Sequence, residues 1–205
     1  MIPDLGKEAR TASGFELRMS TDGSHLANFR GYASVTEVQY PVAGGPELGG
    51  WVETMSRGSF KRTLGMNDNR ALLYAHDNAR VLATTRAGTL SLTEDNVGLL
   101  VDAQLSTRVG WVADLVNQIE DGTVDEMSIG FRVPPGASKW SADWNERTIN
   151  EVALLEATVT WAGANGATVA TIERCKSIVN EHRSQAGIDR VAIAARAAAA
   201  ALRLK

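Results

Sequence analysis

The segment 126–131 carries one side chain that could act as a nucleophile, the hydroxyl of Ser128. Apolar Ile129 and Phe131 alternate with Ser128 and Gly130, and this period of two is typical of a half-buried strand. Ser128 is expected on the face opposite the apolar side chains, beside a glycine that leaves room for another backbone or a substrate. Most strand serines have no chemical role, so Ser128 is of interest only if a base lies close to it.

Histidine is the side chain best suited to take the proton of a hydroxyl at neutral pH. The sequence holds three histidines. His25 falls in a predicted turn and His182 on a predicted tail helix, whereas His76 follows the strongly apolar strand segment 71–74. If an imidazole base operates in this protein, His76 is the natural candidate.

A serine–histidine pair works best with an acid that fixes the imidazole tautomer and stabilises its cation. Asp77 is next to His76, but neighbours on a strand face opposite ways, so Asp77 could not easily reach the ring. Glu156 lies inside the apolar run 152–159, where a buried carboxylate requires a partner. Glu156 could equally face solvent from an edge strand, so these residues alone leave its role open.

The elements that would position these side chains are mainly short strands. Alternating apolar residues and turn signals predict strands near 15–19, 29–35, 51–53, 71–74, 81–85, 89–93, 99–105, 126–133 and 152–161. One amphipathic helix is expected over 109–119 with Thr107 as its cap, and a short one is expected after Ser56 or Ser59. We therefore predict an α+β fold with a β-barrel-like, mostly antiparallel sheet, flanking helices and a helical C-terminal tail.

Composition limits the class of protein. The chain has 205 residues, 44% hydrophobic and 22% charged, which suits a globular domain with appendages. A net charge of −3 argues against a nucleic-acid partner, and the absence of a long apolar run or a signal-peptide pattern predicts no membrane partner. A single cysteine, Cys175, fits a reducing compartment such as the cytoplasm. Neither a phosphate-binding loop nor paired zinc ligands are present, so no cofactor or metal is predicted.

Three short sequence motifs follow one another along the chain: ALLYAHD over 71–77, MSIGF over 127–131 and LLEATV over 154–159. Together they resemble the tailed-bacteriophage prohead maturation protease family. Segments 57–64 and 31–33 are also similar to the early Gly-Ala-Phe segment and the opening strand of that family. The resemblance covers roughly residues 15 to 172.

This resemblance implies a serine protease with a fold similar to the herpesvirus assembly proteases, a β-barrel wrapped by helices. Matching the motifs makes His76 the base, Ser128 the nucleophile and Glu156 the third catalytic residue. The sequence departs from the family where 161–166 replace a Pro-Ala-Asn-Pro type motif. Backbone N–H groups of this glycine-rich turn could still bind an oxyanion, and the candidates are Gly163, Ala164 and Asn165.

The resemblance also implies partners and a setting. We expect a serine endopeptidase that cleaves scaffold or capsid-protein segments during prohead maturation, inside the immature capsid in the host cytoplasm. A non-catalytic capsid-assembly or scaffold module with the same fold is the leading alternative. A small-molecule-binding barrel with a helical interaction tail is a second one.

The chain divides into three predicted parts. Residues 1–13 are expected to form a flexible N-terminal arm, 14–172 the serine protease domain and 173–205 a helical tail. The alanine-rich stretch 187–205 has a weak apolar face, which favours docking on scaffold, on capsid protein or on a second copy in a homodimer. It could equally pack on its own domain, or be a segment that the protease removes from itself.

Overall fold

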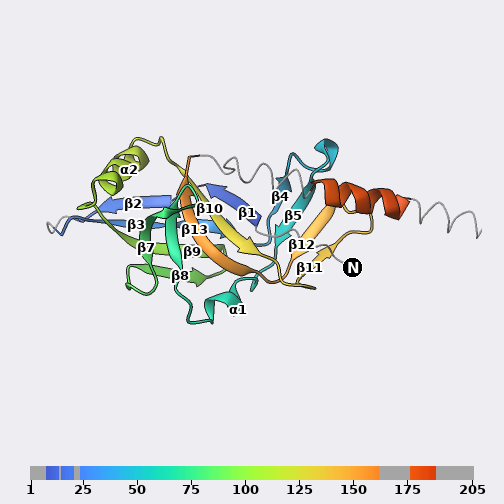
Figure 1. Cartoon of the computed structure of the whole chain (residues 1–205), viewed down its shortest axis with the longest axis horizontal. Coiled ribbons are helices and arrows are strands. Elements are labelled where there is room, and N and C mark those ends of the chain that lie inside the picture. The colour runs from blue at the N-terminus through green and yellow to red at the C-terminus, as the bar shows by residue number, and fades with distance from the viewer. Residues whose placement is uncertain (1–7, 14, 21–23, 162–175, 188–205) are drawn as a thin grey trace, which may run out of the picture.

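Strands make up most of the protein in the computed structural model, which describes residues 8–13, 15–20, 24–161 and 176–187 (Figure 1). The strands are β1 (Glu8–Ser13), β2 (Phe15–Met19), β3 (Leu26–Val35), β4 (Gln39–Val42), β5 (Trp51–Met55), β6 (Ala71–Tyr74), β7 (Asp77–Thr84), β8 (Leu90–Glu94), β9 (Gly98–Ser106), β10 (Glu126–Arg132), β11 (Ser138–Trp140), β12 (Glu146–Ile149) and β13 (Ala153–Thr160). The helical segments are η1 (Pro46–Leu48), α1 (Lys61–Leu64), α2 (Gly110–Glu120) and residues 176–187. The predicted α+β class is confirmed.

The strands are arranged in three sheets. Their strand orders are β1-β10-β13-β6-β7, β2-β3-β9-β8 and β11-β12-β5-β4. Each order has two ends, so no sheet in the described part of the chain closes on itself, and the expected barrel is not found. Strand periodicity reports which residues alternate between faces, but it carries no information on whether the outer strands of a sheet meet. Most pairs are antiparallel, as expected, while β13–β6 and β12–β5 are parallel.

Strand β10 lies inside the first sheet, between β1 and β13, and it also contacts β3 of the second sheet. The sequence predicts a half-buried strand here, but all residues from Met127 to Phe131 are buried. Ile129 and Phe131 belong to the main apolar core, as do Phe29 and Leu72. The face that carries Ser128 is therefore covered as well, and the alternation in the sequence separates two buried faces.

Helix α2 is confirmed, with Val112, Leu115, Val116 and Ile119 buried on one face. Its expected cap is wrong, because the Thr107 hydroxyl donates to the carbonyl of His25 and no side chain caps the helix. Neither Ser56 nor Ser59 caps α1. The carboxylate of Glu94 lies there instead, and it accepts the N–H groups of Gly58 and Phe60.

The stretch predicted as an N-terminal arm includes strand β1. It pairs with β10, and Thr11 stands opposite Ser128 in the register. Glu8 is buried and accepts a hydrogen bond of 2.6 Å from Arg147, a buried residue of β12. Burying an arginine and a glutamate as a pair costs much less free energy than burying either charge alone. The contact between Glu8 and Arg147 therefore fixes β1 to the rest of the domain. Residues 8–13 are therefore part of the folded body.

Residues 176–187 form a helix beside the third sheet, drawn in red at the end of the molecule opposite α2 (Figure 1). Val179 is fully buried and clusters with Val42 and Trp51. Arg183 donates to the carbonyl oxygens of Gly50 and Trp144, at 2.6 and 2.9 Å for its Nη2. This part of the predicted tail packs on its own chain, whereas residues 188–205 lie outside the described residues. In the described ranges, no helix has the length and apolar character needed to span a bilayer.

Candidate active site

His76 occupies a tight turn between two strands of the first sheet. Strands β6 and β7 are joined by Ala75 and His76 alone, and Tyr74 pairs with Asp77 across the turn. Both turn residues have positive φ angles, 53° for Ala75 and 60° for His76. These are the features of a two-residue type I′ hairpin, which usually carries Asn-Gly. The sequence predicts a strand that runs into His76 and Asp77, because Ala-His gives no turn signal.

The register of the first sheet puts the other two candidate residues on one face. Ser128 of β10 is opposite Thr158 of β13, and Gly130 is opposite Glu156. Residues two apart on a strand share a face, so Ser128, Thr158 and Glu156 all point to the same side. The parallel β13–β6 pairing sets Val159 beside Tyr74, which brings the His76 turn to the same place.

The three side chains form a continuous hydrogen-bonded series. His76 Nδ1 is 2.7 Å from Glu156 Oε1, and His76 Nε2 is 3.0 Å from Ser128 Oγ. A neutral imidazole can satisfy both contacts in one tautomer, in which Nδ1–H donates to the carboxylate and Nε2 accepts the serine proton. Nε2 is thus the nitrogen free to take the Ser128 proton, and the carboxylate lies where it would stabilise the resulting cation.

All three groups are shielded from water. Ser128 is 0% exposed and Glu156 5%, and the side chain of His76 is 9% exposed. Electrostatic contacts are stronger where water is excluded, so the contact between Glu156 and an imidazolium gains from this burial. Glu156 therefore does not face solvent from an edge strand, which was the other reading of the sequence.

Asp77 has local partners instead. Its carboxylate accepts the N–H of Ala79 at 2.8 Å, and it lies 3.9 Å from the guanidinium of Arg80. As the first residue of β7, Asp77 follows the turn and is exposed. The expectation that Asp77 does not easily reach the His76 ring agrees with these contacts.

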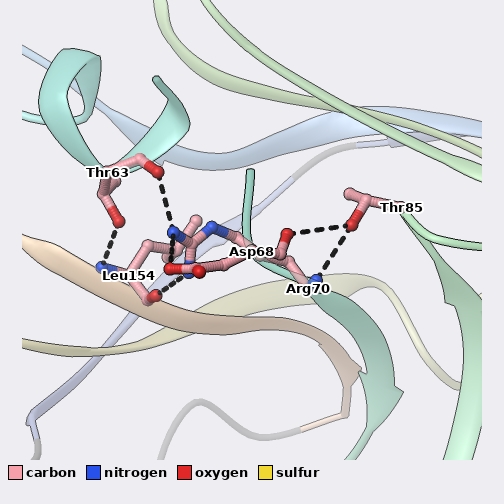
Figure 2. Close-up of polar contacts among 5 residues, drawn as sticks. All are labelled: Thr63, Asp68, Arg70, Thr85 and Leu154. Atoms are coloured by element: carbon pink, nitrogen blue, oxygen red, sulfur yellow. Dashed lines mark hydrogen bonds and ion pairs between the residues drawn. The ribbon is translucent and has the colours of Figure 1, made fainter. Parts of the chain in front are cut away.

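A buried arginine ties together the elements that carry His76 and Glu156 (Figure 2). Arg70, just before β6, donates to the carbonyl of Leu154 on β13 at 2.5 Å and to that of Thr63 on α1 at 2.7 Å. The Thr63 hydroxyl in turn accepts the Leu154 N–H at 3.1 Å. Thr85 accepts the backbone N–H of Arg70 at 2.9 Å. Strand β6 is thereby fixed to the start of β13, two residues before Glu156.

Two residues near the site have no counterpart among the sequence predictions. Thr158 accepts the backbone N–H of His76 at 3.0 Å, and its place two residues after Glu156 is the one signal that could have indicated it. Arg70 gave no signal, because a single arginine before a strand is usually exposed. The oxyanion candidates Gly163, Ala164 and Asn165 lie outside the described residues. Within the described ranges, no three His, Cys, Asp or Glu side chains are grouped to hold a metal ion.

No curated protein and no solved structure matches this chain. A family model described as Caudovirus prohead serine protease matches residues 14–183, which is most of the chain, and the protein therefore belongs to that family.

Proposed function

We propose that this protein is a serine endopeptidase in which Ser128 is the nucleophile, His76 the general base and Glu156 the acid that orients and stabilises it. The observation that carries the proposal is the buried series of hydrogen bonds from Glu156 through His76 to Ser128. Family membership supports the reaction class and the setting, a protease of phage prohead maturation.

The proposed reaction has two halves. Ser128 Oγ attacks the carbonyl carbon of the scissile peptide while His76 Nε2 takes the hydroxyl proton, which gives a tetrahedral intermediate. The C–N bond then breaks, and the same Nε2 proton passes to the leaving amine. A water molecule repeats the sequence on the acyl-enzyme, and the carboxylic acid product leaves with Ser128 regenerated. Backbone N–H groups of Gly163, Ala164 and Asn165 are our candidates to bind the oxyanion.

The proposed substrates are scaffold or capsid-protein segments of the phage, cut inside the immature capsid in the host cytoplasm. This substrate class follows from the family alone.

The test compares the wild-type protein with Ser128→Ala and with Ser138→Ala. Ser138 is a matched control, because it is also a buried strand serine but lies on β11 in the third sheet. Each protein is treated with a fluorophosphonate probe, and each is co-expressed with the capsid and scaffold proteins of its phage for mass spectrometry. We expect labelling and truncated products with wild type and Ser138→Ala, and neither with Ser128→Ala. An unlabelled wild type without truncated products would overturn the proposal in favour of a non-catalytic assembly module.

A further inference from the structure

The turn that carries His76 is held in place by a residue outside the proposed catalytic three. We propose that Thr158 is a positioning residue, whose hydroxyl fixes the His76 backbone so that the ring meets both Ser128 and Glu156. This inference rests on the proposed function for its kinetic consequence, while the geometry it describes can be tested without activity.

The turn needs external support because of its backbone conformation. Ala75 and His76 both have positive φ, a region that residues with a Cβ adopt only at a cost. Two hydrogen bonds to β13 hold the turn there. Ala75 N–H donates to the carbonyl of Val159 at 2.9 Å, and His76 N–H donates to Thr158 Oγ1 at 3.0 Å. The first bond needs only backbone atoms, but the second requires a side-chain acceptor at residue 158.

Thr158 is well placed to provide that acceptor. It is 0% exposed and stands directly opposite Ser128 in the β10–β13 register. A β-branched side chain has few χ1 rotamers, so its oxygen is held rigidly. The hydroxyl also lies 3.5 Å from the carbonyl oxygen of Val159, to which it can donate its own proton while it accepts the His76 N–H. One oxygen on β13, the strand paired with that of the nucleophile, thus holds the backbone of the base.

Removing this acceptor should affect catalysis more than folding. Thr158→Val keeps the branched shape but leaves the His76 N–H without its partner, so the turn can relax and move the ring. Because hydroxyl attack depends on the Nε2–Oγ alignment, we expect the rate to fall about tenfold to a hundredfold. Thr158→Ser keeps the oxygen and should stay within about threefold of wild type.

The experiment uses the full-length protein and two readouts. The first is the second-order rate constant for fluorophosphonate labelling of wild type, Thr158→Val and Thr158→Ser. The control is Thr36→Val, the same change at a buried threonine beyond the end of β3. The second readout is the downfield proton NMR resonance of the His76 Nδ1–H bonded to Glu156, assigned by its loss in His76→Ala. Melting temperatures show whether each variant is folded, and Thr158→Ala replaces Thr158→Val if the latter does not fold.

The expected result is slow labelling and a shifted or broadened Nδ1 proton in Thr158→Val, with both readouts near wild type in Thr158→Ser and Thr36→Val. Thr158→Val within twofold of wild type in rate, with an unchanged resonance, would overturn the inference. Thr158→Ser as impaired as Thr158→Val would overturn it too, since the oxygen would then not be what matters. A wild-type protein that is never labelled counts against the proposed function alone. The response of the resonance to the two Thr158 variants then decides the inference.

Discussion

The ring of His76 is the group on which the proposed chemistry depends, because each of its nitrogens faces a different partner. Glu156 lies at Nδ1 and Ser128 at Nε2. Proton transfer from the serine makes the ring positive. The negative charge of Glu156 then stabilises the ring more than a hydrogen bond alone would. The two carboxylates considered as partners of His76, Asp77 beside it in the sequence and Glu156 beside it in the fold, should therefore differ strongly in their effect on rate.

The first prediction separates these two acids. Glu156→Gln keeps the size of the side chain but removes the charge, and its amide can bind the ring in the wrong tautomer. We expect kcat to fall by about a hundredfold to ten-thousandfold, in line with the loss of the acid in other serine triads. Asp77→Asn should change kcat by less than about threefold, because the described contacts of Asp77 are with Ala79 and Arg80.

The measurement is steady-state cleavage of one peptide by both variants, with melting temperatures recorded so that unfolding is not mistaken for lost catalysis. A crippled Asp77→Asn beside a nearly normal Glu156→Gln would show that the third residue is wrongly assigned. The contact between His76 and Ser128 would survive that result.

The sequence indicated the three candidate residues more clearly than their arrangement in space. The strand alternation around Ser128 and the apolar run around Glu156 are local signals, and both residues do lie on strands of one sheet. The turn at His76 could not be foreseen, because neither Ala75 nor His76 is a residue that turns of this type favour. Thr158 acts through a hydrogen bond to a residue 82 positions away, and no local pattern encodes such a contact.

Among the elements, β6 and β13 must hold a fixed position relative to each other, because β6 leads to His76 and β13 carries Glu156. Arg70 contributes to this relation with hydrogen bonds to carbonyl groups of both Leu154 and Thr63. Its side chain is 9% exposed, whereas the carboxylate of Asp68, 3.5 Å away, is largely in solvent. The guanidinium therefore has mainly backbone oxygens as its partners.

The second prediction is that Arg70→Met destabilises the protein by about 2–4 kcal/mol. Methionine fills similar space but leaves the buried carbonyl groups of Leu154 and Thr63 without their donor. Urea unfolding of wild type and variant measures the difference, and Arg86→Met, at an exposed arginine in the turn after β7, is the control. A variant as stable as wild type would mean that water replaces the guanidinium at no cost.

A second link between elements depends on pH. The Tyr32 hydroxyl on β3 donates to Asp95 at 2.6 Å, in the turn between β8 and β9. This bond, followed by the N–H groups of Val97 and Gly98, lowers the pKa of Asp95 below its ordinary 3.8. The same bond to Asp95 is the main cause that raises the pKa of Tyr32 above 10.0.

The third prediction follows from the sign of these shifts. Asp95 contributes stability fully above about pH 3.8 and loses it as pH falls through the lower, folded-state pKa. Tyr32 contributes its full stabilisation of the fold below about pH 10.0, and this stabilisation is lost as pH rises through the raised pKa of the folded state. Asp95→Asn should therefore melt below wild type at pH 7, and the gap should narrow as pH is lowered below 3.8. A gap that stays constant down to pH 2 would show that the charge of Asp95 contributes nothing.

For the whole molecule, the sequence predicts the α+β class correctly but not whether a sheet closes into a barrel. The strands that the sequence predicts lie close to their expected positions, as does α2, because period-two alternation and a 3.6-residue apolar face are local properties. Whether the outer strands meet depends on pairings between distant segments, such as β6 with β13. The same holds for β1, whose attachment through Glu8 depends on Arg147, 139 residues further along the chain. A polar segment with one glutamate gives no sign that this glutamate is buried.

The C-terminal region has two parts. Residues 176–187 are attached to the domain, whereas docking of residues 188–205 on a partner stays a prediction. Residues 176–187 pack on the third sheet through Val179. The ring centroids of Trp144 and His182 are 4.5 Å apart.

The last prediction is that these two parts behave differently when changed. Val179→Asp places a carboxylate at a fully buried site and should lower stability by several kcal/mol, whereas truncation after residue 187 should leave the melting temperature and fluorophosphonate labelling near wild type. The truncated protein should nevertheless enter capsids poorly if 188–205 dock on scaffold or capsid protein. Co-purification of protease with immature capsids, quantified by mass spectrometry, measures this, with inactive Ser128→Ala in both lengths so that self-cleavage cannot shorten the tail. Equal incorporation of both lengths would rule out a docking role for 188–205, and a large loss of stability on truncation would show that these residues belong to the folded domain instead.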